Sequence, residues 1–277
     1  MPTMASGVHL WPVLVPPAIV ISVPTLRVAK KLASKLSFSR RLHTGLFSLW
    51  EGYRDGVLVA VVYCQGDEDV HYACVRHLAH LYRVACVTLV EPVVAVSEDL
   101  ALGDVIIVRE ARHYFCPTAL PGNLDAPNEL LFRGEQVQEW LGAPPVLASP
   151  KFLDAWSRIK APDLRKGIST VAKFCNIGSS SRPIRGWRAP EFVRSHFSVE
   201  VVDEGAYGFL CACKDVGLTG GIVGVVEAAV THQLGMTTDS GTMSRKLQEA
   251  ALAALDVAYG EFASISFRRI LPETCSP

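Results

Sequence analysis

The clearest evidence for the architecture lies in CVTLVEPVVAVSEDLALGDVIIV, residues 86–108. Residues 87–90 are almost wholly apolar and residues 105–108 are wholly so, which predicts two buried strands with a loop between them. Strands that are buried on both faces are typical of α/β proteins, in which helices cover the sheet. Glu91-Pro92 ends the first predicted strand, at the kind of position where open α/β sheets bind their ligands.

Strands and helices alternate outward from this stretch. A strand is predicted at 18–23, and an amphipathic helix follows near 26–36 with its leucines, Val28 and Ala33 inward and its lysines outward. The other expected elements are a hairpin over 46–64 that turns at Asp55-Gly56, a helix from 67 to 82, two strands, and two helices near 203–216 and 241–262. Hairpins together with strand–helix crossovers predict one α/β domain over residues 1–277, with a central mixed twisted sheet flanked by helices and an irregular, Pro-rich excursion at about 116–150.

Composition argues against several classes of protein. The 277 residues, 49% of them hydrophobic, supply a substantial core. Lys and Arg together number 27, as do Asp and Glu, so the overall charge does not indicate nucleic acid as a partner. The eight cysteines are scattered without a CxxC pair, which argues against a disulfide framework and a zinc site and favours a reducing compartment.

The N-terminal segment LWPVLVPPAIVISVP, residues 10–24, is apolar, but four prolines interrupt it. A membrane span needs about 20 uninterrupted apolar residues. A signal peptide needs a basic flank, whereas the first 26 residues contain no Lys or Arg, which also argues against a mitochondrial presequence. We therefore expect an intracellular, cytoplasmic protein without membrane contact; a mitochondrial location stays open, although no presequence supports it.

Four segments resemble, in order, those of a known superfamily. They are GVHL (7–10), VISVPTLRVAKKLASKL (20–36), SEDLALGDVIIVREA (97–111) with Gly103-Asp104 intact, and VEVVDEGAYGFLCACKDVGLTGGIVGVV (199–226). The chain resembles the nucleoside phosphorylase/nucleosidase superfamily over nearly its whole length, and it is most similar to the uridine phosphorylase branch. The resemblance implies a single α/β domain, cleavage of nucleoside N-glycosidic bonds as the family chemistry, and assembly into dimers or larger oligomers.

The resemblance also implies a ribose site. Glu204 stands where the family has the glutamate that holds the ribose hydroxyls, and His9 lies in the N-terminal His-Leu segment that reaches the same site. A carboxylate there stabilises the cationic ribosyl state through which the glycosidic bond breaks. The Asp203-Glu204 pair has a second interpretation, because the macrodipole favours acidic residues at a helix N-terminus. Even without catalysis, an apolar cleft and one carboxylate can hold a nucleoside weakly.

The family's phosphate-binding residues are largely replaced. Arg27 matches the Arg of its Gly-Asp-Pro-x-Arg loop only with a shift of one residue, and Arg41 precedes the hairpin where the family has an Arg that reaches the neighbouring subunit's phosphate. Glu91 and Pro92 stand where an Arg-x-Gly-Thr-x-Gly loop would cradle the anion. Because proline has no N–H to donate and a glutamate repels a dianion, we expect phosphate binding to be lost.

The catalytic position is depleted as well. Hydrolytic members of the superfamily keep an Asp or a related polar residue at a position that falls here near Ala228 or Ala229. Glu227 and His232 are the remaining candidates for an acid, Glu227 only after a slip in register. The base-recognition Gln-Glu-Arg segment of the uridine branch is missing from residues 175–190. Neither a cofactor nor a metal ion is implied.

Two functions from different classes follow. The first is a catalytically degenerate, nucleoside phosphorylase-like protein that serves as an assembly, structural or regulatory subunit, as a homodimer or in a hetero-oligomer with a paralogue or larger complex. The alternative is an altered phosphorylase or nucleosidase in which Glu204 holds the ribose and Glu227 or His232 acts as the acid.

The family's mode of assembly adds a prediction about the surface. Dimers of the uridine branch bring the N-terminal segment and the hairpin of one subunit to the other's site. We therefore expect the apolar hairpin residues Phe47, Leu49 and Trp50 to be covered by a partner, because a large exposed apolar patch is poorly tolerated in solution.

Overall fold

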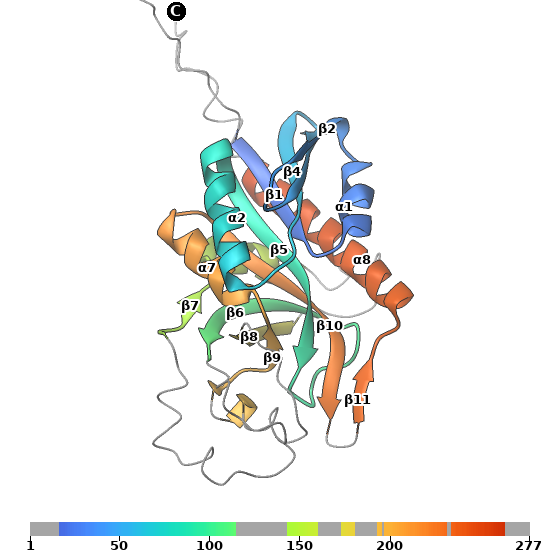
Figure 1. Cartoon of the computed structure of the whole chain (residues 1–277), viewed down its shortest axis with the longest axis vertical. Coiled ribbons are helices and arrows are strands. Elements are labelled where there is room, and N and C mark those ends of the chain that lie inside the picture. Colours follow the sequence, from blue (N-terminus) through green and yellow to red (C-terminus); the bar gives the residue numbers. More distant parts are fainter. Residues whose placement is uncertain are drawn as a thin grey trace, which may run out of the picture.

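A computed structural model describes residues 17–114, 143–159, 173–180, 193–195, 197–231 and 234–263. Within these residues the chain is one α/β domain with a mixed 11-stranded sheet flanked by helices, as the sequence predicts (Figure 1). The predicted excursion at 116–150 lies mostly outside the described residues, which resume at 143. None of the helices in the described ranges is long and apolar enough to span a membrane.

The elements have the following bounds. The strands are β1 (Pro17–Val23), β2 (Ser37–His43), β3 (Ser48–Arg54), β4 (Val57–Tyr63), β5 (Arg83–Ala95), β6 (Val105–His113), β7 (Val146–Leu147), β8 (Lys173–Ser179), β9 (Val201–Asp203), β10 (Gly220–Thr231) and β11 (Leu234–Thr237). The helices are α1 (Leu26–Ala33), α2 (Glu68–Leu81), α4 (Pro150–Ser157), α7 (Ala206–Asp215) and α8 (Ser240–Ala258), which a π-helical turn, η2 (Tyr259–Ala263), extends. The sequence therefore predicted fewer strands than the chain forms.

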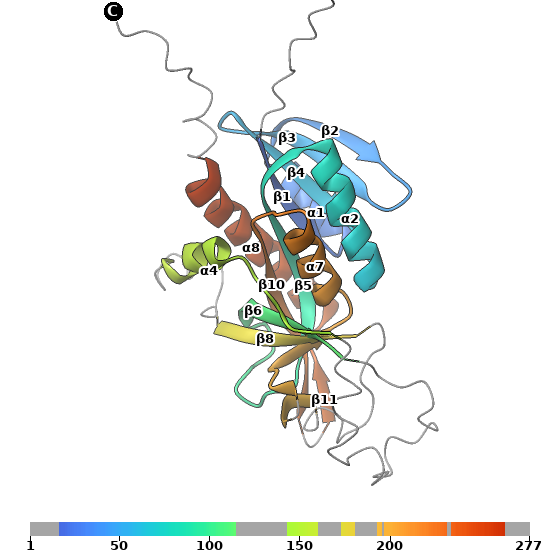
Figure 2. The same cartoon turned by 90° about the vertical axis from the view of Figure 1, so that its left-hand side faces the viewer.

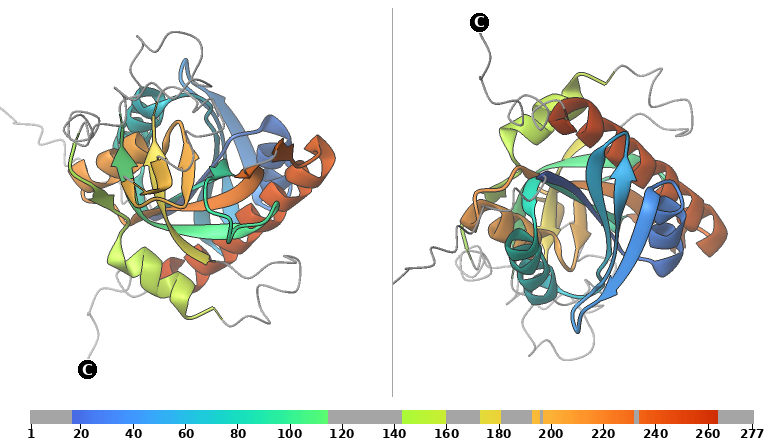
Figure 3. Two further views of the ribbon diagram at one scale, coloured as in Figure 1. Left: turned by 90° about the horizontal axis from the view of Figure 1, so that it is seen from below. Right: turned by 90° about the horizontal axis from the view of Figure 1, so that it is seen from above.

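The sheet closes on itself in its second half. The strand order is β11-β10-β6-β8-β9-β5-β1-β4-β3-β2, with β7 paired to β6, and β10 also pairs with β5. The β10–β5 pairing joins β5, β10, β6, β8 and β9 into a ring, while β1, β4, β3 and β2 extend from β5 as an open sheet (Figure 3). Strand β5 belongs to both parts, so residues at its carboxyl end lie where the open sheet meets the ring.

Helices cover both faces of the sheet. α1 and α8 pack on one face, and α2 and α7 pack together on the other (Figure 2). The buried side of α8 consists largely of alanines, with Ala250, Ala251 and Ala254 almost fully buried, which lets the helix lie close to the strands. Asp239 accepts a hydrogen bond from the Thr242 N–H at 2.8 Å and caps the start of α8.

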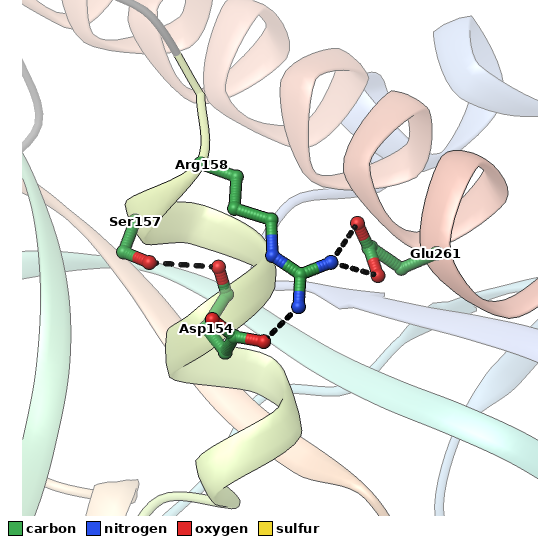
Figure 4. A network of polar contacts seen from close by, with 4 residues as sticks. All are labelled: Asp154, Ser157, Arg158 and Glu261. Atoms are coloured by element: carbon green, nitrogen blue, oxygen red, sulfur yellow. Dashed lines mark hydrogen bonds and ion pairs between the residues drawn. The ribbon is translucent and has the colours of Figure 1, made fainter.

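The end of α4 is tied to the end of α8 (Figure 4). Arg158 Nη1 lies 3.2 Å from both carboxylate oxygens of Glu261, and Nη2 pairs with Asp154 one turn earlier in α4. All three side chains reach solvent, which screens such pairs and leaves them a small contribution to stability. The network therefore orients α4 more than it stabilises the fold.

Two turns have the residues that their backbones require. Asp55 and Gly56 connect β3 to β4 with φ angles of 49° and 82°, which confirms the predicted hairpin turn. Gly103 adopts φ 81° just before β6, and Asp104 accepts the Ala101 N–H at 3.0 Å and pairs with Lys173 at 2.9 Å. Gly103-Asp104, the Gly-Asp pair of the sequence motif, therefore forms a turn that determines where β6 begins.

The loop predicted after residue 90 is wrong, because β5 continues through Glu91-Pro92 to Ala95. Residues 91–95 pair with β10 in parallel register, with Glu91 opposite Gly224. On the other side, β1 has ended opposite Leu89 and β9 begins only opposite Val94. Pro92 therefore lies in a gap between two neighbours, where a missing N–H breaks no ladder on that side.

The prediction that a partner covers the apolar residues of the hairpin is also wrong. Phe47, Leu49 and Trp50 are buried within the chain itself, at 3%, 0% and 8% exposure. Leu26, predicted to point inward, is instead 36% exposed at the start of α1. The open part of the sheet has helices on both faces, so side chains that alternate along β3 are covered on either side.

Candidate functional site

Polar side chains from several strand ends gather on the side of β5 that faces α2 and α7. Glu91 comes from β5, Ser179 ends β8, Asp203 ends β9, and His113 ends β6. Glu68 joins them from the first turn of α2, whose N-cap is Asp67. The carboxyl ends of strands are the usual position of a ligand site in α/β folds, which makes this cluster the candidate site.

The buried Glu91 and the partly buried Asp203 form a carboxyl pair. Glu91 is 7% exposed, and burial followed by the charge of Asp203 raises its pKa well above the ordinary value. Burial also raises the pKa of Asp203. Two ionised carboxylates offer acceptors only, and accordingly Glu91 Oε1 and Asp203 Oδ1 have no hydrogen-bond donor among the described residues. Both pKa shifts favour the protonated form, and a proton on either carboxyl supplies a donor to the other.

The second oxygen of Asp203 positions the next helix. Asp203 Oδ2 accepts the backbone N–H of Gly205 at 2.9 Å and that of Ala206 at 2.6 Å. This capping ends β9 and starts α7 at Ala206, three residues later than the helix predicted at 203–216. The anion at the helix N-terminus is favoured by the macrodipole, as the second interpretation of the Asp203-Glu204 pair proposed.

Glu68 and His113 form the second polar pair of the cluster. Glu68 Oε2 lies 3.3 Å from His113 Nε2. Burial is the largest cause that raises the pKa of Glu68, to about 7, and the charges of Asp203, Asp69 and Asp67 add to it. Burial lowers the pKa of His113. Both shifts disfavour the charged forms, so burial weakens an ion pair between the two groups.

Ser179 links the two pairs. It is fully buried, and although its Oγ makes no hydrogen bond of ordinary geometry, it lies close enough to Glu68 and Asp203 to lower the pKa of each slightly against the effect of burial. Tyr207, from the first turn of α7, contacts His113, with the ring centres 5.3 Å apart and the ring planes tilted by 40°. The cluster is therefore continuous from β5 to the surface of α7.

Two glycines bring α7 onto α2 closely enough to form the cluster. A Cβ at Gly208 would lie 2.1 Å from the backbone oxygen of Glu68, and one at Gly205 would lie 2.3 Å from His71 Cδ2. His71 is buried and its pKa is lowered to about 4 by burial, so this contact is with a neutral ring. The glycines of the EGAYG segment thus fix the distance between Glu68 and Asp203.

The structure brings two of the predicted site residues together. Glu204 is exposed just before α7, and Glu227 lies half-buried on β10. Burial, and then the charge of Glu204, raises the pKa of Glu227. The two carboxylates therefore lie near enough to interact electrostatically. His9 and His232 lie outside the described residues.

The predicted phosphate ligands lie elsewhere. Arg27 is exposed on α1. Arg41 lies on β2, the edge strand of the open sheet, with its guanidinium carbon 5.2 Å from the ring centre of Trp50 on β3. Neither arginine interacts with Glu204 or with the carboxyl cluster in the described part of the chain. Among the described residues, no Lys or Arg forms an ion pair with the carboxyls of the cluster, Glu68, Glu91 and Asp203, and Glu204 lies next to them in the chain.

Sequence reasoning missed Glu68, His113, Ser179 and the role of Asp203. Each of these residues follows or ends a strand, or begins a helix directly after one, and that position was the available signal. Among the described residues, no group of three or more His, Cys, Asp or Glu side chains is arranged to hold a metal ion. The cysteines in the described ranges are free thiols, and five of the six are buried.

We expect Glu68 to titrate near neutral pH. The carboxyl carbon resonance of Glu68, assigned by its absence in a Glu68→Gln variant, should move with a midpoint near 7. The folded pKa lies above the unfolded one, so the stability that the protonated group provides is complete at acidic pH and is lost as the pH rises through 7. A midpoint at about 4, the ordinary value for a glutamate, would contradict the burial of this side chain.

Comparison with known proteins supports the fold. No family model and no curated protein matches the chain in sequence. In structure, the chain matches a 5′-methylthioadenosine/S-adenosyl homocysteine nucleosidase from Campylobacter jejuni with TM-score 0.68 and 9% identity, over 88% of this chain and 99% of that one. It also matches a futalosine hydrolase mutant of Helicobacter pylori with TM-score 0.66 and 11% identity, over 88% and 99% of the two chains.

A third match is the methylthioadenosine/S-adenosylhomocysteine nucleosidase from Neisseria meningitidis in complex with methylthio-immucillin-A, with TM-score 0.65 and 16% identity over 89% of this chain and 99% of that one. At such identities the likeness establishes the fold alone. The chain has the α/β fold of the nucleoside phosphorylase/nucleosidase superfamily, which confirms the fold class that the sequence predicts.

Proposed function

We propose that this chain is a catalytically degenerate protein of the nucleoside phosphorylase/nucleosidase fold, retained as an assembly, structural or regulatory subunit. The observation that supports this most is the course of β5 through Glu91-Pro92. The motif comparison puts an anion cradle at these residues, and instead of an opened backbone the chain has a paired strand with a buried carboxyl in it. The placement near the uridine phosphorylase branch in particular rests on the sequence motifs.

The electrostatics of the cluster support the same proposal. In the part of the chain that the structure describes, no Lys or Arg pairs with Glu91 or Asp203, so phosphate would approach two acidic groups, and like charges at contact repel strongly where water is excluded. Pro92 offers no N–H to an anion. The motifs put the family's anionic ligand at the position of Glu91 and Asp203. In this proposal, the chain's own carboxyls therefore occupy the anion site.

The alternative, an altered nucleosidase, has one observation in its favour. Glu204 and Glu227 lie within electrostatic reach of each other, and the raised pKa of Glu227 suits a general acid. Glu204 would then hold the ribose hydroxyls while Glu227 protonates the leaving base. This alternative requires water to replace phosphate, because the phosphate candidates Arg27 and Arg41 lie on other elements.

Turnover decides between the two. Purified full-length chain, incubated with purine and pyrimidine nucleosides with and without phosphate, is expected to release free base at least ~10²-fold more slowly than an active nucleosidase assayed beside it, because loss of a single electrostatic stabiliser typically costs that much. Base release would be followed by liquid chromatography. Cleavage that disappears in both Glu204→Gln and Glu227→Gln, while Glu249→Gln retains it, would overturn the proposal in favour of the nucleosidase.

An oligomeric assembly and an intracellular location remain part of this proposal. With Phe47, Leu49 and Trp50 buried inside the chain, the hairpin no longer supplies a reason for a dimer. The large apolar side chains that are exposed in the described ranges are scattered over several elements: Leu26, Leu46, Tyr53, Leu81, Leu147 and Phe174. A partner is therefore better sought through charge than through an apolar patch.

A further inference from the structure

We propose that helices α2 and α7 act together as a proton-controlled latch over the strand ends, which stays closed while the carboxyls beneath it hold protons and opens as they ionise. The two helices pack together on one face of the sheet (Figure 2). Their first turns meet at the cluster, because a Cβ at Gly208 would lie 2.1 Å from the backbone oxygen of Glu68. The proposal concerns the regulation of the candidate site, and it does not depend on whether that site turns over a nucleoside.

The strand ends beneath the latch carry a continuous polar row. His113, Ser179 and Asp203 are register partners across β6, β8 and β9, so their side chains project from the same face of the sheet. Neighbouring strands lie about 4.8 Å apart, which keeps successive members of the row close together. Glu68 reaches the row from α2, with Oε2 3.3 Å from His113 Nε2, and Glu91 joins it beside Asp203. The latch therefore closes on groups whose spacing is set by the sheet.

The closed cluster is short of hydrogen-bond donors. In the described part of the chain, four of its buried side-chain oxygens make no hydrogen bond of ordinary geometry: Glu68 Oε1, Glu91 Oε1, Ser179 Oγ and Asp203 Oδ1. No Lys or Arg in the described ranges forms an ion pair with these three carboxyls. A buried acceptor without a donor is unfavourable, and protons on the carboxyls are the donors that the cluster itself can supply. Ionisation removes those donors and leaves like charges in a site without water.

The other titratable groups around the cluster do not offset this charge. They are Asp67, Asp69 and His71 of α2, His113 of β6, Glu204 before α7, and Tyr207, Cys211, Lys214 and Asp215 of α7. Burial lowers the pKa of both histidines, that of His71 to about 4, so neither ring gains a positive charge as the pH rises. Burial raises the pKa of Tyr207 to about 12 and also raises that of Cys211. Lys214 interacts with Cys211 and forms no ion pair with the three carboxyls among the described residues.

The direction of the pH effect follows from the pKa shifts. In the closed form, burial raises the pKa of Glu68 to about 7, and it also raises the pKa values of Glu91 and Asp203. In the open form water reaches the carboxyls, and their pKa values return toward the ordinary values near 4. The closed form therefore binds more protons than the open form above about pH 4, so the latch is most firmly closed at acidic pH. Each such proton makes opening about tenfold more favourable per pH unit, up to about pH 7 for Glu68.

Hydrogen exchange of the full chain tests the latch, measured by mass spectrometry from pH 5 to pH 8 and corrected for the intrinsic exchange rate at each pH. Amides of α2 and α7 should lose protection by at least about tenfold per pH unit between pH 5 and pH 7. Their exchange should depend little on low concentrations of urea, because local opening exposes little surface. Amides of α8, which packs on the other face of the sheet, should be more strongly protected at every pH and should show the urea dependence of whole-chain unfolding.

Two variants and a matched control assign the effect to the cluster. Glu68→Gln and Glu91→Gln each remove one ionisable proton, so each should make the pH dependence of exchange in α2 and α7 shallower, by up to about tenfold per pH unit. Asp256→Asn, which removes a mostly exposed carboxyl from α8, should leave that pH dependence unchanged. Circular dichroism confirms that each variant is folded.

Two results would overturn the latch. One is that α2 and α7 have the same protection and the same urea dependence as α8 at pH 8, because the cluster would then affect only the unfolding of the whole chain. The other is that both glutamine variants keep the pH dependence of the unchanged chain. Neither result bears on the proposed loss of turnover, which the base-release assay tests separately.

Discussion

Gly208→Ala should lower the free energy of unfolding by about 1–2 kcal/mol. The added methyl group would lie 2.1 Å from the backbone oxygen of Glu68 and 2.6 Å from its carbonyl carbon, far inside van der Waals contact. Overpacking typically costs about 1–3 kcal/mol, and this contact is with backbone, which cannot rotate away as a side chain does. Alanine returns about 1 kcal/mol through its higher helix propensity, so the net loss should remain large.

Gly260→Ala is the matched control, because it makes the same substitution in η2 where nothing lies within 4 Å of the added methyl group. Urea denaturation of both variants should show a lower midpoint for Gly208→Ala and an unchanged or higher one for Gly260→Ala. The titration of Glu68 is a second measurement, and it tests whether the substitution disturbs the candidate site. If α7 moves away from α2, the burial that raises the pKa of Glu68 is reduced, and the carboxyl resonance should titrate at a lower pH. An unchanged midpoint in both variants would show that the two helices do not meet at Gly208.

The fold was accessible to sequence reasoning where local signals are strong. The hairpin turn at Asp55-Gly56 needs two residues at positive φ, and only a few residue types supply them, so the prediction was confirmed. Strand β1 and helix α1 follow from short apolar runs and a 3.6-residue period. The course of β5 was not predictable in this way, because proline is read as a break and the gap between β1 and β9 exists only in the assembled sheet.

The candidate site was predicted in part for a similar reason. Glu204 was identified from its place in a motif, and its approach to Glu227 follows from the fold that the motif implied. Asp203 and Glu91 lie 112 residues apart in the chain, and only the pairing of β9 with β5 brings them together. These two side chains are shielded from water because the strands close into a ring. The residues next to Glu91 or Asp203 in the sequence therefore give no sign of that burial.

Glu91→Gln should make the protein more stable at pH 8 and should reduce the dependence of stability on pH. Burial, with the charge of Asp203, raises the pKa of Glu91 in the folded chain, whereas the unfolded chain ionises this group at its ordinary value near 4.5. The folded state therefore binds more protons than the unfolded state above that pH, and stability falls as the pH rises. The limit is about 1.4 kcal/mol per pH unit for one proton. Glutamine carries no ionisable proton, and its amide N–H can donate to Asp203 at every pH.

Urea midpoints measured from pH 5 to pH 8 should thus be similar for the two proteins at pH 5 and should diverge steadily above it, with the variant higher. Asp256→Asn, which removes a mostly exposed carboxyl from α8, should follow the unchanged chain throughout. Asp203 and Glu68 retain raised pKa values of the same sign, so part of the decline persists in the variant. A variant that is less stable than the unchanged chain at pH 8 would mean that Glu91 is ionised and balanced by a cation. The proposal of a site filled by its own protonated carboxyl would then fail, because a residue that is charged and paired could give way to an incoming anion.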